Sequence, residues 1–366
     1  MPPPDDARPV DSAIDVVERL AELPAEDWNA LTAGRYPFLT HEFLVAAESS
    51  GCVSPATGWR PRHLVLRDAG GKLRAAMPLY EKSHSWGEFV FDWAWASAYQ
   101  RAGVSYYPKL VSAAPFTPAP SPRLLLADRS DHEAGAALVR AAVALARDEG
   151  LSSLHVQFPL PEEHPMLIAA GLRLRKDCQF HWHNDGYRSF EDFLQRLNAR
   201  KRKKAKRDRR RVAEQGIGFR RLGGRDVDAA LWSDVHALVS LTFLRRGSMP
   251  YLDESFFCEF ARSRPDDILV ILAERGRQTL AAGVFYRGAD TLYGRYWGSD
   301  GHYDALHFET CYYQGIDFCI RHGIARFEPG TQGEHKISRG FVPVTTWSAH
   351  WLARPEFFAA IGDYLR

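Results

Sequence analysis

The sequence predicts an α/β protein made of two domains in tandem. At 366 residues, the chain is longer than most single domains and can bury two sizeable cores. Strand and helix patterns alternate along it, and a similar order begins again after residue 216. A strongly basic segment separates the two runs. We therefore expect a flexible tail over residues 1–11, an N-terminal domain over 12–185 and a C-terminal domain over 186–366.

In the N-terminal half, apolar residues recur with strand and helix periods in turn. Residues 62–67 and 74–80 predict a β-hairpin, because Gly70 and Gly71 supply a tight turn between them. Residues 115–122 contain four prolines and predict an irregular loop. The other expected elements are a strand and a helix within 12–33, helices over 40–49, 130–147 and 162–171, and strands at 109–113, 153–158 and 178–183.

The C-terminal half shows a similar alternation of elements. Its helix over 305–322 is the clearest, because Phe308 and Tyr312 belong to one apolar face with helical spacing. Asp304 is the expected N-cap, and Gly323 stands where a left-handed residue commonly ends a helix. The remaining expected elements are strands at 217–222, 268–274, 279–286, 291–297 and 324–328, and helices at 229–244 and 253–262.

The composition is that of a soluble globular protein, with 45% hydrophobic and 25% charged residues. No apolar run approaches the length of about 18 residues that a membrane-spanning helix needs, and the N-terminus lacks the pattern of a secretory signal. The five cysteines, at 52, 178, 258, 311 and 319, form no CxxC pair, which favours reduced thiols and argues against structural zinc. We expect a cytoplasmic protein without a metal; its oligomeric state stays open.

The basic segment, residues 196–211, holds eleven Lys and Arg and one Asp. It predicts a helix over 190–215 that is basic on every face along its middle. Such a helix is either solvated or bound to a partner. As a binding element it would hold a polyanion such as tRNA, a nucleotide or lipid headgroups, through phosphates rather than base stacking, because it lacks aromatic residues. The candidate phosphate-binding residues are Arg200, Lys201, Arg202, Lys203 and Lys204.

A charged loop after the expected strand at 324–328 is the best candidate for a reaction centre. In open α/β sheets, ligands sit beyond the C-terminal ends of strands. His335 is the best proton carrier, because an imidazole titrates near neutral pH. Lys336 and Arg339 suit an acidic group of a ligand. The candidate catalytic residues are Glu328, His335, Glu309 and Glu334.

Several assignments stay open between a structural and a functional role. Glu309 either complements the dipole at the start of its helix or acts as a base, and Glu328 either pairs with Arg326 or is catalytic. The aromatic-rich segment 84–107 is either a core edge or one wall of a substrate groove. Cys311 is expected in the core. Further substrate-binding candidates are His307, Gln332, Trp297, Tyr107 and Arg123.

Five stretches of the chain carry a family resemblance. They are HSWGEFVFDWAWASAY at 84–99, YYPKLVSAAPFTPAPSPRLL at 106–125, HWHNDGYRSFEDFLQRLNARKRKKAKRDRRR at 181–211, RYWGSDGHYDALHFETCYYQGI at 295–316 and FEPGTQGEHKISRGF at 327–341. With them, the chain from about residue 12 onward resembles the FemAB-like branch of the GNAT superfamily, and within it a bacterial group of predicted N-acyltransferases. The resemblance implies two GNAT-like domains, each a mixed sheet flanked by helices, that face each other across a cleft.

The resemblance also implies a function. It implies an N-acyltransferase that moves an acyl or aminoacyl group from acyl-CoA or aminoacyl-tRNA to an amine, such as a cell-wall precursor or an amino-acid derivative. No tightly bound cofactor is expected. Two departures bear on the donor: Ser121 replaces an expected glycine, and 298–306 lacks the glycine pattern by which acetyl-CoA enzymes hold pyrophosphate. The alternative is a non-catalytic protein that binds peptidoglycan, peptide or RNA on a degenerate acyltransferase fold.

Overall fold

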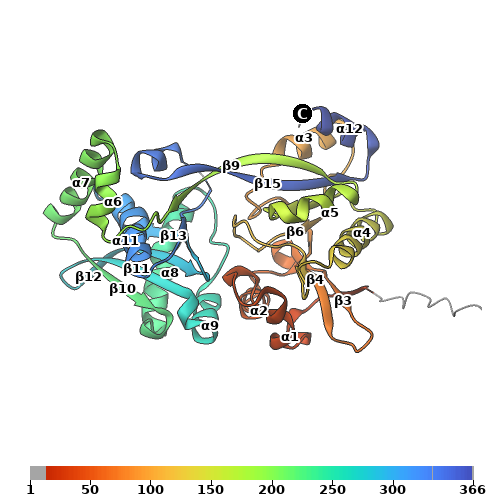
Figure 1. The fold of residues 1–366 in the computed structure, drawn as a ribbon, viewed down its shortest axis with the longest axis horizontal. Coiled ribbons are helices and arrows are strands. Elements are labelled where there is room, and N and C mark those ends of the chain that lie inside the picture. The colour runs from red at the N-terminus through yellow and green to blue at the C-terminus, as the bar shows by residue number, and fades with distance from the viewer. Residues whose placement is uncertain (1–13, 332, 365–366) are drawn as a thin grey trace, which may run out of the picture.

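The computed structural model describes residues 14–331 and 333–364, and its two halves lie side by side (Figure 1). Each half combines parallel and antiparallel strand pairs with helices packed on them. The mixed α/β fold expected from the sequence is therefore confirmed. No helix within these residues is long and apolar enough to cross a membrane.

The N-terminal half contains a four-stranded antiparallel sheet in the order β1-β3-β4-β7. Strands β3 and β4 pair as the expected hairpin, with a bulge after Leu66. The sheet comprises β1 (Ile14–Val17), β3 (His63–Arg67), β4 (Leu73–Met77) and β7 (Leu125–Leu126). The helices of this half are α1 (Ala25–Thr32), α2 (His41–Ser49), α3 (Trp93–Arg101), α4 (His132–Asp148) and α5 (His164–Ala169).

An eleven-stranded mixed sheet runs through both halves in the order β10-β11-β12-β13-β14-β9-β15-β8-β6-β5-β2. Its earlier strands are β2 (Trp59–Pro61), β5 (Tyr80–Lys82), β6 (Lys109–Ser112), β8 (Ser153–Gln157) and β9 (Arg173–His183). Its later strands are β10 (Gly218–Gly223), β11 (Ile268–Arg275), β12 (Gln278–Arg287), β13 (Thr291–Ser299), β14 (Arg326–Glu328) and β15 (Val342–Leu352). Two neighbouring pairs are parallel, β6 with β8 and β13 with β14, so each half contains one parallel pair.

Two strands of eleven residues each cross between the halves. β9 precedes the basic segment in sequence but pairs with β14, and β15 comes after it but pairs with β8. The two strands also pair with each other along most of their length, and Figure 1 shows both running from one half to the other. Helix α12 (Pro355–Tyr364) then packs Ile361 into a cluster with Trp95 and Tyr99 of the N-terminal half. The chain after residue 341 thus joins the N-terminal half, and the boundary at 185/186 stays a prediction.

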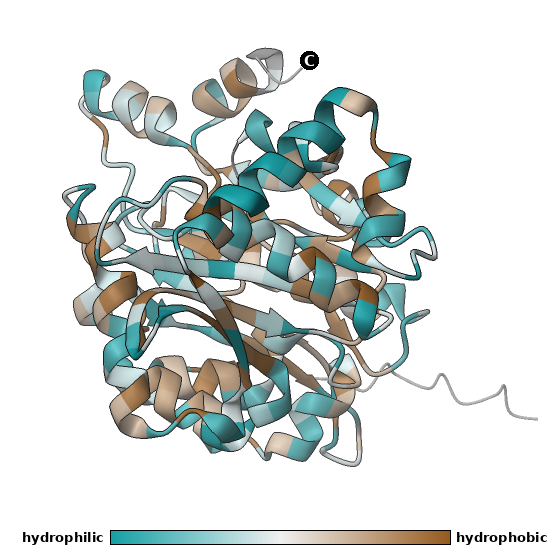
Figure 2. Ribbon diagram, turned by 90° about the vertical axis from the view of Figure 1, so that its left-hand side faces the viewer, coloured by the Kyte–Doolittle hydropathy of each residue, from teal (hydrophilic) through white to brown (hydrophobic). Residues whose placement is uncertain are grey.

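The remaining helices are α6 (Phe190–Arg196), α7 (Ala199–Glu214), α8 (Ala229–Leu244), α9 (Glu254–Ser263), α10 (Leu306–Phe308) and α11 (Gln314–Arg321). The single basic helix expected over 190–215 is wrong, because the chain is extended at Asn198, whose side chain caps α7 by accepting from the Lys201 amide. α7 is also not basic on every face, although it is teal over most of its length in Figure 2. The buried residues of α7 are Ala205, Asp208 and Val212.

The helix expected over 305–322 is interrupted by a π-helical turn, Glu309–Tyr313, between α10 and α11. The expected cap at Asp304 is wrong, because the chain enters α10 through Ala305 in a left-handed conformation with a φ of 62°. Asp304 instead pairs with an arginine of α7 at 2.9 Å. Gly323 follows α11 with a φ of 64°, as expected. Turns of the π type often accompany functional sites.

Candidate functional site

A cavity of about 730 Å³ opens where strands β13 and β14 separate. The two strands pair in parallel over three residues, after which β14 ends at Glu328 and β13 continues to Ser299. A β-bulge in β13 adds Arg295, which has no partner in the register with β12. Bulges bend a strand and redirect its side chains. The diverging strands therefore leave a gap between them, and the cavity lies at this gap.

Both halves contribute walls to this cavity. The N-terminal half supplies apolar side chains from segment 84–107 and the proline-rich loop, including Trp86 and Phe116. The C-terminal half supplies the cations Arg246, Arg295 and Lys336, together with further aromatic residues. None of the described lining residues is an aspartate or a glutamate. The cavity is therefore aromatic and positively charged.

The aromatic segment 84–107 is divided between the cavity and the core, and a role in substrate binding stays a prediction. Trp86 and Phe89 line the cavity. Trp95 and Tyr99 are buried in a core cluster with α12. The segment is thus one wall of the cavity on one side and a core edge on the other.

Two imidazoles expected to be functional lie on the wall. His335 Nε2 is 2.9 Å from the Tyr312 hydroxyl, and burial together with nearby cations lowers the pKa of His335. Burial lowers the pKa of His307 to about 4, and its ring packs edge-on against Trp297, with centroids 5.4 Å apart. Both imidazoles are therefore neutral near neutral pH and able to accept a proton.

Lys336 is a buried cation on the same wall, with 2% of its surface exposed. Its Nζ donates to the Gly330 carbonyl at 2.7 Å. Burial, aided by Arg295, lowers its pKa to about 8. No carboxylate of the described residues forms an ion pair with it, and a buried charge without a partner is costly. Lys336 is therefore suited to meet an acidic group of a ligand.

Glu328 lies behind the wall rather than on it, with 3% of its surface exposed. Its Oε1 is 3.7 Å from Arg326 Nε and 3.8 Å from His181 Nδ1, and its Oε2 is 3.9 Å from Arg295 Nη2. These separations exceed hydrogen-bond distance, so burial dominates and raises the pKa of Glu328 to about 7. Its catalytic role stays a prediction, for a carboxyl close to the cavity but not lining it.

The other two carboxylates expected to be catalytic lie off the wall. Glu309 is 2% exposed. Its Oε1 accepts from Gln314 at 2.8 Å and lies 3.2 Å from Arg209 of α7. Glu334 is exposed at the start of a 3-10 turn over 334–339. The contacts of Glu309 connect the π-helical turn to α7, which is a structural task.

Two arginines expected to bind substrate take part in other networks. Arg339 is 1% exposed and donates to Asp208 of α7 at 3.1 Å. Arg123 is fully buried, and its guanidinium donates to backbone carbonyls of its own loop and of β8. Gln332 lies outside the described residues.

The proline-rich loop closes the end of the other parallel strand pair, β6 and β8. The loop follows β6 directly, and its Ser121 amide donates to the Phe158 carbonyl just after β8. Arg123 Nε adds a bond to the Gln157 carbonyl at 2.6 Å. In the N-terminal half, the place that corresponds to the gap between β13 and β14 is thus filled by the proline-rich loop. The gap in the C-terminal half is therefore the candidate site.

The cations at the start of α7 have few partners within the protein. Arg200 and Lys203 are exposed. Among the described residues, the ion pairs made by α7 involve only its later positions. These are Lys206, Asp208, Arg209, Arg210 and Arg211. Lys204 Nζ donates to Ser338 Oγ at 3.1 Å, which joins α7 to the loop that carries Lys336. The unpaired start of α7 therefore adjoins one wall of the cavity.

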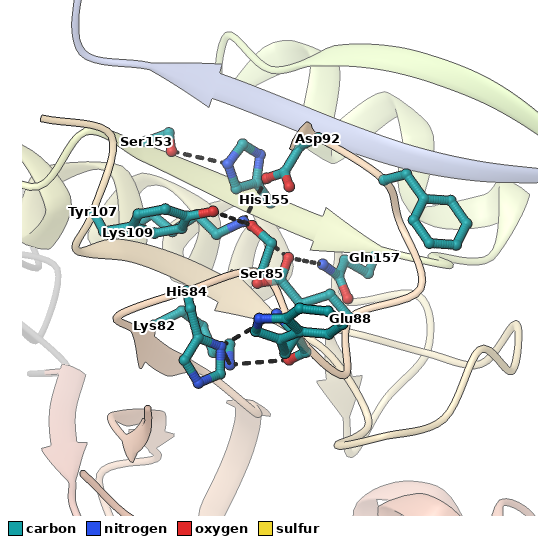
Figure 3. Close-up of polar contacts among 12 residues, drawn as sticks. Lys82, His84, Ser85, Glu88, Asp92, Tyr107, Lys109, Ser153, His155 and Gln157 are labelled. Carbon is teal, nitrogen blue, oxygen red and sulfur yellow. Dashed lines mark hydrogen bonds and ion pairs between the residues drawn. The ribbon is translucent and has the colours of Figure 1, made fainter. Parts of the chain in front are cut away.

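A buried charged cluster in the N-terminal half, drawn in Figure 3, was not predicted from the sequence. Lys109 Nζ donates to Ser85 Oγ at 2.8 Å and to Glu88 Oε2 at 2.9 Å, and it pairs with Asp92. Burial raises the pKa of Glu88 to about 6. For Asp92, burial is outweighed by Lys109 and by hydrogen bonds, so its pKa is lowered. The Tyr107 hydroxyl lies 2.8 Å from Ser85 Oγ, which places this substrate-binding candidate here rather than on the cavity wall.

Arg295 is a further functional candidate that was not predicted from the sequence. It is 3% exposed by side chain, and its Nη1 donates to the carbonyls of Gly294 and Glu328 at 3.0 and 3.3 Å. Strand alternation alone does not locate a bulge, so its position could not be read from the sequence. Cys311, expected in the core, lines the cavity, where burial raises the pKa of its thiol.

Comparisons with known proteins agree with this architecture. The fold is similar to that of FemX, with a TM-score of 0.54 and 12% identity over 85% of this chain and 92% of that one. It is also similar to the C-terminal domain of a putative lysylphosphatidylglycerol synthetase from Agrobacterium fabrum, with a TM-score of 0.56 and 11% identity over 93% and 96%. A third match, with a TM-score of 0.50 and 13% identity over 94% and 99%, is a tandem GNAT protein from the clavulanic acid biosynthesis pathway.

Sequence comparison gives the family. No curated protein sequence matches the chain. The profile of the FemAB-like family, described as peptidoglycan biosynthesis/recognition, matches residues 19–366. This match covers almost the whole chain and includes both halves and the cavity between them. The protein therefore belongs to the FemAB-like family.

Proposed function

We propose that the protein is an N-acyltransferase whose reaction takes place in the cavity between β13 and β14. The observation that carries this proposal is a neutral imidazole, a tyrosine hydroxyl and a buried cation together on the wall of a strand opening. Amide formation from an activated acyl group needs a base for the acceptor amine, donors for the carbonyl oxyanion and a proton for the leaving group. The wall offers a group for each need.

His335 is the proposed general base. Its lowered pKa keeps the imidazole unprotonated near neutral pH, and the contact with Tyr312 at 2.9 Å orients the ring. Tyr312 is the proposed proton donor to the leaving group, because burial raises its pKa and keeps the hydroxyl protonated. Lys336 holds a carboxylate or a phosphate of one substrate in this proposal.

The open edge of β13 supplies backbone donors. β14 pairs with β13 only over its first three residues, so residues 294–299 have no strand beside them on that side. Amide groups that face the opening can bind an extended ligand in the manner of an added strand. The same groups can stabilise the oxyanion of an acyl group held there.

The proposed donor is acyl-CoA or aminoacyl-tRNA, and the acceptor is an amine such as that of a cell-wall precursor or an amino-acid derivative. The unpaired cations of α7 support a donor rich in phosphates. Their connection to the cavity wall through Lys204 and Ser338 supports a donor that reaches the cavity from this side.

The test uses panels of acyl-CoA thioesters and aminoacyl-tRNAs, each with amine acceptors, and measures release of CoA thiol or loss of the tRNA acyl group. His335→Ala should lower turnover by about 100- to 10,000-fold, the usual cost of losing a general base, without changing the urea midpoint of unfolding. His132→Ala, at an exposed position of α4, is the matched control. If His335→Ala turns over like the parent, His335 is not the base.

A second candidate function is RNA binding without catalysis, and the unpaired cations of α7 favour it. Replacing Arg200, Lys201, Lys203 and Lys204 by Gln should weaken tRNA binding and flatten its dependence on salt. Binding unchanged at low salt would leave α7 as a solvated helix. Binding of tRNA by the parent with no turnover of any donor would favour this second function.

A further inference from the structure

Most of the exposed large apolar side chains of the described residues lie in segments that line or adjoin the cavity. Nine large hydrophobic residues of the described chain are exposed, and seven of them lie in three segments that line or adjoin the cavity. We call these seven the rim: Trp86, Phe91, Trp93, Leu244, Met249, Ile337 and Val342. Single exposed apolar residues are normal on a protein surface, but the occurrence of seven of nine in segments that flank one cavity indicates a contact surface.

The rim residues are strongly exposed and partly in contact with one another. Met249 is 70% exposed and Trp86 is 56% exposed. Trp86 and Trp93 meet edge-on, with ring centroids 5.2 Å apart. Trp86 also lines the cavity, so the rim is continuous with the cavity wall.

The charges between the rim residues are cationic. Arg245 and Arg246 are exposed between Leu244 and Met249, and the guanidinium of Arg245 donates to the Asp300 backbone carbonyl at 3.3 Å. Ile337 directly follows Lys336 and precedes Ser338, which accepts from Lys204 at the start of α7. The exposed cations within the rim segments are thus Arg245 and Arg246, because Lys336 is 2% exposed.

The carboxylates of the rim segment 86–93 are withdrawn from the surface. Glu88 and Asp92 are 2% and 3% exposed, and both point to Lys109 in the buried cluster (Figure 3). The segment 244–249 contains no carboxylate. In the third segment Glu334 is exposed in the same 3-10 turn as Ile337. The other two segments present Trp, Leu, Met and Arg without an exposed acidic group, which is complementary to an anionic bilayer, where aromatic rings sit at the headgroup level and cations meet lipid phosphates.

We propose that the rim docks the cavity mouth on an anionic lipid bilayer. We favour a bilayer over an acidic protein as the partner. An acidic protein would match the cations, but it would not require so many apolar side chains of different shape at one edge. The role of docking in the reaction rests on the proposed function: docking would present the amine of a membrane-held amphiphile to the cavity. Docking itself is independent of that reaction and is tested without it.

The experiment is co-sedimentation of the full chain with vesicles of phosphatidylcholine alone or of phosphatidylcholine and phosphatidylglycerol in equal parts. Binding is expected to the anionic vesicles and should weaken as salt is raised. Trp93→Ser with Met249→Ser, neither of which lines the cavity, should weaken binding about tenfold or more. Arg245→Gln with Arg246→Gln should weaken it about fivefold per charge.

The matched control carries Val16→Ser and Ile168→Ser, which remove exposed apolar side chains outside the rim, at 41% and 54% exposure. It should bind anionic vesicles like the parent. No binding to anionic vesicles at low salt, or an equal loss in the control and the rim variant, would overturn docking. The His335→Ala variant separates the two proposals: it should bind vesicles like the parent even when its turnover is lost, and vesicle binding lost there would contradict the rim as the docking surface.

Discussion

The replacement of Lys109 by methionine removes the cation at the centre of the buried cluster. Methionine has nearly the same length and apolar volume, so the change deletes the charge and leaves the packing. Glu88 and Asp92 then lie buried, at 2% and 3% exposure, without the ammonium that pairs with both. Removing one partner of a buried ion pair typically costs about 3–5 kcal/mol. Against a total stability of about 5–15 kcal/mol, the loss is large enough to measure.

The pH dependence of this loss follows from the two carboxyls. Without Lys109, both acquire folded-state pKa values above those of the unfolded chain, and the pKa of Glu88 is raised to about 6 even with Lys109 present. A carboxyl of this kind contributes stability below its unfolded pKa that disappears as pH rises through its folded pKa. The deficit of Lys109→Met should therefore be smaller at pH 5 than at pH 8.

The assay is urea unfolding followed by tryptophan fluorescence, at both pH values. The matched variant carries Glu88→Gln and Asp92→Asn in addition, which removes the stranded charges, and it should recover most of the loss. A deficit below about 1 kcal/mol at pH 8, or one that grows as pH falls, would refute the reasoning that Lys109 neutralises these carboxyls.

Two further predictions concern the strands β13 and β14 beside the cavity. Gly298→Ala in β13 should destabilise the protein by about 3 kcal/mol or more, because a Cβ there would lie 1.8 Å from the Leu238 carbonyl oxygen of α8. The control is Gly218→Ala in β10, where no atom lies within 4 Å of the added Cβ. Equal urea midpoints for the two variants would contradict the prediction. Glu328→Gln should gain stability relative to the parent as pH rises from about 4 to 7, because the pKa of Glu328 is raised to about 7 from an unfolded value of about 4.3; urea midpoints at pH 5 and 8 test this, and a relative gain at the lower pH would contradict it.

Local patterns predicted those elements whose residues interact with near neighbours in sequence. The hairpin of β3 and β4 follows from its glycine turn, and α4 follows from its apolar period. The π-helical turn at Glu309–Tyr313 was not predicted, because it replaces one helical pattern by another of nearly the same period. The break at Asn198 was not predicted, because only two extended residues interrupt the helical pattern there. The exchange of β9 and β15 was not predicted either, since pairing between distant strands leaves no local signal.

The site was predicted in part for a related reason. His335, Lys336, His307 and Trp297 lie on the cavity wall, because the loop that carries two of them follows the end of a strand. Arg339 and Arg123 have the same chemistry but face inward, to an aspartate of α7 and to backbone carbonyls. Burial separates these cases, and it depends on packing that spacing in sequence does not determine.

The exchange of β9 and β15 has a consequence for how the protein folds as it is synthesised. β8 receives its antiparallel neighbour from residues 348–352 of β15, so the N-terminal half cannot complete its sheet until those residues have left the ribosome. Until then, β8 presents an unpaired edge, which invites pairing with other chains. Contacts of such long sequence separation also slow folding. Fragments cut near residue 185 should consequently aggregate rather than fold, although each contains most of one half.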